Sequence, residues 1–456
     1  MQSESKCELL LRARGIVTSR EAVDALGVNQ STVSRAMNAL GSRRILRIGK
    51  ARAARYGLRR SVRGQNSEWP VYCIDSDASA ALVGRLYSLE RGYWVFEQQN
   101  AWDTLRGREF RDGLYPGLPW FMHDLRPKGF LGRCFAHCHA AELGLPRDPR
   151  LWSDDDALMG LLKVGADLPG AFVIGEAMLA VVQNRMLHSS LPEDDRTTAY
   201  PRLANAVLAD EMPGSSAAGE QPKFTACVRN SGGDVRHVIV KFSGAAGRPE
   251  DRRWADLLVA EHIVNRILDE SGIPCASTAV FSAGDRTFLE SQRFDRVGEF
   301  GRRGLVTLEA QDAAFYGEIT TPWTMAADRL RSDGWLCAED ADRLSLLWWF
   351  GTLIGNTDMH YGNISLFLEP NRPLQLAPVY DMVPMLYRPG IEGQFRNQPL
   401  VPTPPAPETI PIWSRSASLA MHFWSELAEE PMASAAFRSI ATQNAETLLA
   451  LKDRFC

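Results

Sequence analysis

Apolar positions near the start of the chain recur with the spacing of short helices. Residues 5–14 alternate like an amphipathic helix, and residues 29–40 place their apolar side chains on one face. Between these segments, Thr18 and Glu21 have the spacing of a capping box, and Gly27 ends the short helix that they begin. Two short helices joined by a glycine-containing turn predict a helix-turn-helix.

The next segment is rich in arginine and alternates like a pair of strands. Residues 44–50 and 56–59 predict two strands around a basic turn, so residues 1–65 are expected to form a winged helix-turn-helix. This segment carries 14 Lys and Arg against 4 Asp and Glu, although the whole chain has a net charge of −4. Such a basic module predicts binding to duplex DNA, with a protein-interaction module as the alternative. The side chains expected to contact DNA are Gln30, Ser31, Thr32, Ser34, Arg35, Arg52 and Arg55.

Residues 66–205 give a weaker pattern, with many Trp and Gly residues and short apolar runs, and we treat them as a separate subdomain. The most apolar stretch of the chain, residues 344–355, is too short to span a bilayer. Charged residues interrupt the start of the chain, which argues against a signal peptide there. The 8 cysteines are too scattered for a disulfide framework. We therefore expect a cytoplasmic protein with reduced thiols and no membrane partner.

Residues 223–242 predict a hairpin that has a lysine within an apolar strand. Residues 223–229 and 235–242 predict its two strands, and Lys241 lies within the second. In a helix predicted over residues 251–271, Glu261 falls at the centre of the apolar face. A buried carboxylate without a partner is costly, so we expect Lys241 to pair with it, as in the lysine–glutamate pair of kinases. The alternative is an edge lysine with its head in water and a rotated helix that exposes the glutamate.

A loop of small residues precedes this hairpin. Gly214 and Gly219 have the spacing of a P-loop, but Glu220 stands where that motif needs lysine, which argues against a Walker A site. The backbone amides of the loop are instead candidates for contact with phosphates, with Lys223 nearby.

The segment GNTDMHYGNISLFL, residues 355–368, carries the densest polar chemistry. Asp358 and Asn363 are spaced as in the kinase catalytic loop D-x-x-x-x-N, and Asp381 follows beyond a proline-containing turn. One acid can accept a hydroxyl proton while the asparagine and the second acid hold magnesium. A metal-dependent nuclease that uses Asp358, His360 and Asp381 is the alternative.

Together these motifs resemble those of the HipA family of bacterial toxin kinases. The matching segments are GEQPKF at 219–224, VIVKF at 238–242, ESQRFDR at 290–296, NTDMHYGN at 356–363 and APVYDM at 377–382. They occur in the family's order, and the fused N-terminal module is most similar to the YjjJ (HipH) subgroup of that family.

The resemblance implies an α+β fold, namely a two-lobed protein-kinase-like (HipA-like) structure with an N-terminal winged helix-turn-helix. The implied boundaries are 1–65 for the DNA-binding module, 66–205 for a HipA-like N-terminal subdomain, 206–296 for the kinase N-lobe with P-loop and hinge, and 297–456 for the helical C-lobe.

The resemblance further implies a serine/threonine protein kinase with ATP and Mg²⁺ as cofactors. Asp358 would be the catalytic base, and Asn363 and Asp381 would bind the metal. The implied ATP contacts are Gly219, Lys223, Lys241, Glu261, Glu290, Gln292 and His360, with the backbone near 290–292 as the adenine hinge. The implied site of autophosphorylation is Ser216, with Ser215 as the second candidate.

The implied partners are a protein substrate, by family analogy one of the translation apparatus, and an antitoxin protein. The chain departs from the family in two ways. Gly362 stands where many relatives carry a basic residue, which puts one phosphate contact in doubt, and a chain with its own DNA-binding module leaves the need for an antitoxin open. A DNA-binding transcriptional regulator whose kinase fold senses a ligand or is inactive is a further alternative.

Overall fold

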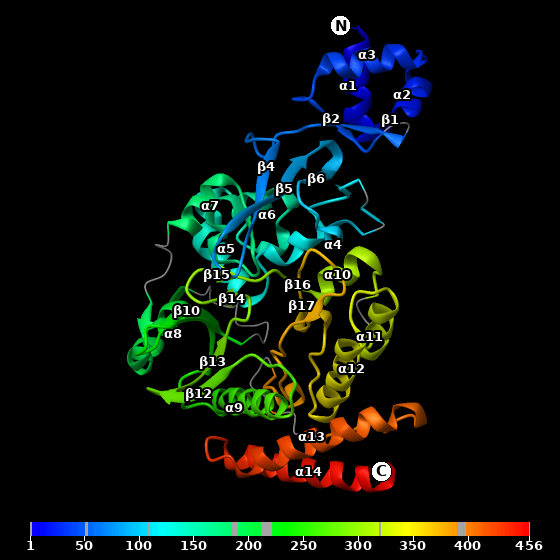
Figure 1. The fold of residues 1–456 in the computed structure, drawn as a ribbon. Helices are drawn as coiled ribbons and strands as arrows, with labels where there is room; N and C mark the ends of the chain where they lie inside the picture. Colours follow the sequence, from blue (N-terminus) through cyan, green and yellow to red (C-terminus); the bar gives the residue numbers. More distant parts are fainter. Residues whose placement is uncertain are drawn as a thin grey trace.

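The computed structural model describes residues 2–50, 53–107, 109–110, 112–184, 190–210, 221–318, 321–390, 395 and 398–455. Figure 1 shows an N-terminal module at one end, a middle unit below it, and then two lobes that finish in a pair of long helices. Helices and strands both contribute to the core, so the fold class is α+β as predicted.

The N-terminal module has the order of helices and strands that the sequence predicts, with one strand more. Thr18 and Glu21 complete the capping box, and Gly27 ends the second helix in the left-handed conformation, at φ 63°. The unpredicted strand β1 pairs with β3, which gives a sheet of order β1-β3-β2. The elements are α1 (Gln2–Arg14), β1 (Ile16–Thr18), α2 (Ser19–Leu26), α3 (Gln30–Leu40), β2 (Ile45–Ile48) and β3 (Arg55–Leu58).

The middle unit, residues 68–183, is built on an antiparallel sheet of order β7-β6-β5-β4-β8. Aromatic side chains fill its core, where the rings of Phe96 and Phe121 lie 5.2 Å apart. Its strands are β4 (Glu68–Ile74), β5 (Ala80–Ser88), β6 (Trp94–Gln98), β7 (Leu114–Tyr115) and β8 (Phe172–Ile174). Its helices are α4 (Asp103–Arg106), α5 (Gly129–Leu143), α6 (Asp154–Val164) and α7 (Glu176–Gln183).

The small lobe, residues 190–302, contains the predicted hairpin within a sheet of order β12-β13-β11-β10-β9. Its strands are β9 (Leu191–Pro192), β10 (Lys223–Arg229), β11 (Val235–Phe242), β12 (Thr278–Ala283) and β13 (Arg286–Gln292). Its helices are α8 (Arg196–Asp210) and α9 (Pro249–Glu270), and a short ribbon of β14 (Arg296–Val297) and β15 (Gly301–Arg302) follows.

The two faces of this sheet differ because successive side chains on a strand point to opposite sides. On the outer face, Val240 and Phe242 pack in a cluster with Tyr200 of α8 and Phe288. Lys241 lies between the first two, so its side chain points to the inner face, where α9 lies. The sheet thus directs Lys241 to its inner face, away from this apolar cluster.

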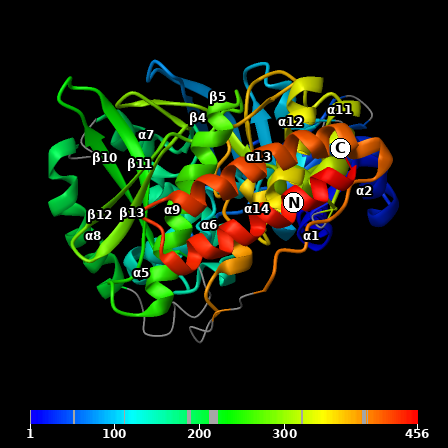
Figure 2. The same cartoon turned by 90° about the horizontal axis from the view of Figure 1, so that it is seen from below.

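The helical lobe completes the chain. Its strands are β16 (Leu305–Thr307), β17 (Ser365–Phe367) and β18 (Gln375–Leu376), and its helices are α10 (Leu308–Phe315), α11 (Trp323–Ser332), α12 (Ala338–Leu353), α13 (Ile410–Glu429) and α14 (Ala435–Phe455). Figure 2 shows α13 and α14 lying side by side across the base of the molecule, where Trp413 and Trp424 are fully buried. In the part of the chain that the structure describes, no helix combines the length and the apolar character needed to cross a membrane.

Candidate active site

A lysine and two carboxylates meet on the inner face of the small-lobe sheet. The Nζ of Lys241 donates to both carboxylate oxygens of Glu261, at 2.7 and 2.8 Å, and both side chains are buried. The predicted pairing is therefore confirmed. Burial alone would lower the pKa of Lys241, but the charges of Asp381 and Glu261 outweigh it and raise that pKa, so the lysine stays protonated.

Asp381 reaches the same lysine from the helical lobe. Its carboxylate forms an ion pair with Lys241, and its backbone lies in the left-handed region at φ 53°. A non-glycine residue holds that conformation only where its surroundings fix it, which is common at functional sites. Burial works to raise the pKa of Asp381, but the charges of Lys241 and of Lys223 lower it to about 2. The aspartate is thus a fixed anion at neutral pH.

The loop after α12 brings Asp358 and Asn363 together. The backbone N–H of Asp358 donates to the side chain of Asn356 at 2.9 Å, and the Asn363 side chain donates to the Asp358 carbonyl oxygen at 2.9 Å. Among the residues with described positions, no hydrogen bond or ion pair engages the half-buried carboxylate of Asp358. It is therefore available to accept a proton from a hydroxyl group.

The ring of His360 folds back onto the backbone of Gly362, two residues later. The side chain of His360 is exposed, and its Nδ1 accepts the N–H of Gly362 at 3.1 Å. A Cβ atom on Gly362 would lie 2.9 Å from this ring, closer than such contacts occur. The folded-back ring of His360 would therefore have to move if position 362 carried a side chain. His360 also contributes, least of the causes, to the lowered pKa of Asp381.

The side chain of Glu290 does not belong to this site. Glu290 lies opposite Val240 in the strand ladder and so faces outward. There its carboxylate accepts the Tyr200 hydroxyl at 2.6 Å and pairs with Arg196 and Arg236. The backbone of residues 290–292 remains a candidate for contact with a nucleotide, and the Gln292 side chain is exposed at the end of β13.

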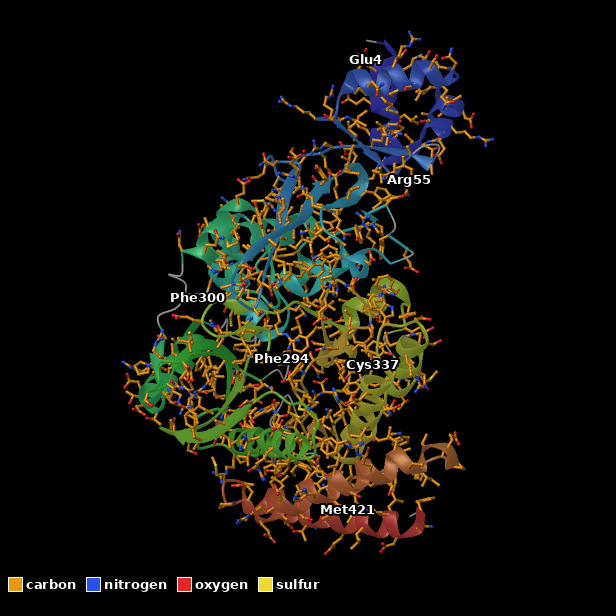
Figure 3. The ribbon with its side chains drawn as sticks, viewed as in Figure 1. Glu4, Arg55, Phe294, Phe300, Cys337 and Met421 are labelled. Carbon is orange, nitrogen blue, oxygen red and sulfur yellow. The ribbon has the colours of Figure 1, made fainter. Side chains whose placement is uncertain are left out.

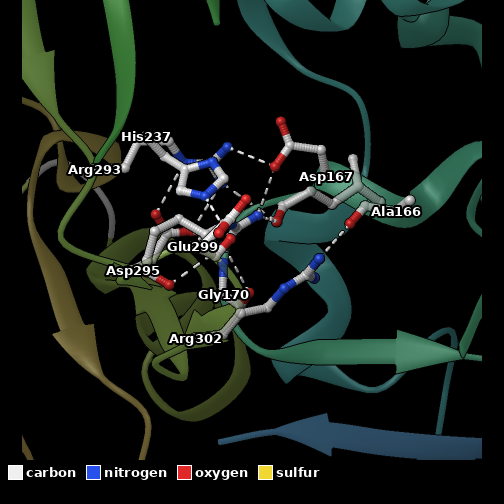
Figure 4. A network of polar contacts seen from close by, with 10 residues as sticks. Ala166, Asp167, Gly170, His237, Arg293, Asp295, Glu299 and Arg302 are labelled. Carbon is white, nitrogen blue, oxygen red and sulfur yellow. Dashed lines mark hydrogen bonds and ion pairs between the residues drawn. The ribbon is translucent and has the colours of Figure 1, made fainter. Parts of the chain in front are cut away.

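A buried cluster of charged residues directly follows β13 and connects it to the middle unit (Figure 4). Arg293 pairs with Asp167 and with Asp295, each at 2.9 Å, and Arg296 pairs with the same two carboxylates at 2.9 and 2.7 Å. Asp295 also accepts the backbone N–H of Gly170 at 2.8 Å. We call these residues the arginine clamp. Sequence reasoning noted the QRFDR motif but did not predict this cluster.

A third arginine extends the clamp without a carboxylate of its own. Arg302 donates to the carbonyl oxygen of Ala166 at 2.6 Å, and burial together with the charge of Arg296 lowers the pKa of Arg302 to about 9. In the same place the backbone N–H of Arg293 donates to the carbonyl oxygen of His237 at 2.8 Å. The clamp thus joins the end of β13, strand β11 and the middle unit.

A second charged group from the middle unit lies beside the loop that carries Asp358 and Gly362. Asp124 accepts the backbone N–H and the hydroxyl of Thr307, at 2.6 and 2.8 Å, at the start of α10. Lys128 lies 3.7 Å from Glu309, whose carboxylate would lie 3.2 Å from a Cβ on Gly362. We did not predict these contacts, although Lys128 belongs to the segment LRPKGFLGR, which also resembles the family.

Asp124 gives a prediction for acid stability. Burial works to raise its pKa, but hydrogen bonds from His123 and Thr307 hold that pKa below its usual value of 3.8. A depressed carboxyl pKa contributes stability that is complete above the unfolded-state pKa and is lost as the pH falls below it. Between pH 5 and pH 2.5, wild type should therefore lose more free energy of unfolding than Asp124→Asn does in urea titrations. Equal losses in both proteins would contradict this account.

The oxygen donors of the site suit magnesium. Among the residues that the structure describes, no three His, Cys, Asp or Glu side chains gather as metal ligands would. Asp358, His360 and Asp381 therefore do not form the cluster that the nuclease hypothesis uses. Asn363 and Asp381 offer the kind of oxygen ligand that magnesium takes when water and phosphate supply the rest.

Four predicted site residues lie outside the described part of the chain: Arg52, Ser215, Ser216 and Gly219. Four of the predicted DNA contacts are exposed on α3: Gln30, Ser31, Ser34 and Arg35. Thr32 is half-buried, and its hydroxyl donates to the Asn29 side chain that caps the helix. Arg55 is placed elsewhere, in an ion pair of 2.8 Å with Asp112 of the middle unit.

Comparisons with known proteins agree with this architecture. Residues 65–183 match the family model of the YjjJ-like toxin middle domain, and residues 215–446 match that of the HipA-like C-terminal domain. The chain is 35% identical to Toxin YjjJ of Escherichia coli (strain K12) over 451 residues, which cover 98% of each protein.

Among solved structures, the chain is similar to one from the toxin–antitoxin complex of HipA, HipB and operator DNA of Shewanella oneidensis MR-1. The TM-score is 0.55 at 18% identity, over 85% of this chain and 97% of the other. This likeness confirms the two-lobed fold predicted from the sequence.

Proposed function

Because the chain belongs to the family of YjjJ-like toxins and carries a HipA-like C-terminal domain, we propose that it is an ATP-dependent serine/threonine protein kinase. The observation that carries the proposal is that Lys241 forms ion pairs with both Glu261 and Asp381. In the loop of Asp358, the Asn363 side chain donates a hydrogen bond to the Asp358 carbonyl oxygen. Kinases need these same groups to position a nucleotide and stabilise the transferred phosphoryl group.

Each residue has a role in the proposed reaction. Lys241, oriented by Glu261, would contact the phosphates, and Lys223 stands opposite it in the β10–β11 ladder. Asp358 would accept the proton of the substrate hydroxyl, since its carboxylate is available for it. Asn363 and Asp381 would hold magnesium, which supplies neutralising charge to the phosphates when bound.

The N-terminal module would bind duplex DNA as a winged helix-turn-helix, with α3 as the helix that enters the major groove. Its exposed polar and basic residues on α3 support this assignment. By analogy with the Shewanella complex of HipA, HipB and operator DNA, an antitoxin protein is a further partner. The substrate would be a cellular protein, by family analogy one of the translation apparatus.

The proposed activity is tested with γ-labelled ATP, Mg²⁺ and a cell extract. We expect label to pass to an extract protein on serine or threonine and, in the enzyme itself, to Ser216 or secondarily Ser215. A phosphate adds about −1.5 to −2 charges to that loop and should weaken ATP binding. Supercoiled plasmid in a parallel reaction should remain intact. Cleavage of the plasmid without transfer of label would identify a nuclease, and neither activity would favour a ligand-sensing regulator.

A further inference from the structure

The sheet of the N-terminal module is covered on both faces. Because strand side chains alternate, Val17, Ile45 and Leu58 pack under the three helices of the module. The neighbouring side chains Leu46 and Ile48 point the other way. There they join a cluster with residues of the middle unit: Tyr87, Leu89, Tyr93, Val95 and Leu114. The wing strands are therefore the surface by which the module is fixed to the rest of the protein.

Backbone contacts make this attachment close. A Cβ on Gly57 of β3 would lie 2.6 Å from the Leu89 side chain. A glycine at this position therefore allows β3 to lie this close to Leu89 of the middle unit. Two residues later, Arg59 forms an antiparallel bridge with Leu89, and the N–H of Arg60 donates to the Ser88 carbonyl oxygen at 3.1 Å. The module is thus held in a fixed orientation.

Much of the module's positive charge serves the same attachment. Five of its arginines pair with carboxylates of the middle unit: Arg12 with Glu90, Arg55 with Asp112, Arg59 with Glu68, Arg60 with Asp155 and Arg63 with Asp156. The Arg60 pair has two contacts of 2.6 Å, and Figure 3 places Arg55 at the border between module and middle unit. In each of these pairs, a carboxylate of the middle unit already balances the charge of the arginine.

Other cations of the module are exposed and unpaired, and some of them lie on or beside its helices. Within the described part of the module, these basic residues are exposed and form no ion pair: Lys6, Arg14, Arg20, Arg35, Arg43, Arg47 and Lys50. Arg47 shares the helix side of β2 with Ile45, and Arg35 lies on the exposed side of α3. Figure 1 shows α3 at the end of the module remote from the middle unit, whereas β1 and β2 border that unit.

We infer that a DNA duplex lies across α3, on the side of the module turned away from the middle unit, and that Arg55 takes no part in holding it. The inference rests on the proposed DNA binding and corrects our expectation that the wing arginine Arg55 contacts phosphates. Both lobes then project away from the duplex, so DNA and a nucleotide can be bound at the same time.

The test measures binding of the full-length protein to a 30-base-pair mixed-sequence duplex by fluorescence anisotropy across a salt series. Arg35→Ala should weaken binding at least about 5-fold and lower the salt slope by about 1. The matched variant Arg55→Ala should stay within about 2-fold of wild type with an unchanged slope.

Asp112→Asn provides the second arm, since it frees Arg55 without removing its charge. It should also bind within about 2-fold of wild type. A loss in Arg55→Ala equal to that in Arg35→Ala, or tighter binding by Asp112→Asn, would overturn the inference. If wild type shows no salt-sensitive binding, the DNA-binding part of the proposed function fails, and the inference fails with it.

Discussion

Replacing Asp358 with alanine is expected to slow phosphotransfer about 10²–10⁴-fold, the usual contribution of a general base. The loop that carries Asp358 is held through its backbone and through Asn363, so removal of the carboxylate should leave the fold intact. The rate is measured with γ-labelled ATP under single-turnover conditions, and the melting temperature serves as the control for folding. A variant that transfers phosphate at nearly the wild-type rate would refute the assignment of Asp358 as the base.

Replacing Asp295 with alanine is expected to lower the free energy of unfolding by about 3–5 kcal/mol, because it leaves two buried arginines short of a partner. Asp295 is 4% exposed and accepts hydrogen bonds from Arg293, Arg296 and Gly170. Its ionised form is strongly favoured, since these arginines outweigh the effect of burial and depress the pKa of Asp295. Equilibrium unfolding in urea measures the change.

The matched control is Asp328→Ala, which removes the same group from a surface ion pair. Asp328 lies 3.2 Å from Arg331, and its side chain is 75% exposed, so this variant should change the unfolding free energy by less than about 0.5 kcal/mol. Similar losses in the two variants would show that the arginine clamp contributes no more than a surface pair.

The elements that could be predicted from the sequence are those with local causes. The Thr18 capping box and the hairpin around residues 230–233 follow from short-range turn chemistry, and both are present. The pairing of Lys241 with Glu261 could be predicted without any structure, because a carboxylate at the centre of an apolar helix face requires a cation. The spacing of Asp358 and Asn363 likewise predicted a loop that holds both residues, and the Asn363 side chain donates to the Asp358 carbonyl oxygen.

What could not be predicted depends on contacts between distant segments. The sequence places Arg55 correctly in a basic strand pair, but whether that residue faces water or Asp112 depends on which side of the sheet is covered. The backbone around Glu290 is predicted to contact a nucleotide, but the motif alone did not show that the alternation of β13 turns the Glu290 side chain outward. Helix α8 contains Pro201 in its interior. Because proline disfavours the interior of a helix, the local sequence does not predict this helix.

The arginine clamp has a consequence for how the protein is made. Asp167 and Arg293 are 126 residues apart in the chain. At roughly 5–20 residues per second, the ribosome adds Arg293 about 6–25 s after Asp167. During that interval Asp167 and the amide of Gly170 lack the partners that residues 293–296 supply. Asp167 can therefore pair with Arg293 and Arg296 only after both arginines have been made and have left the ribosome, so this edge of the middle unit is completed by a much later part of the chain.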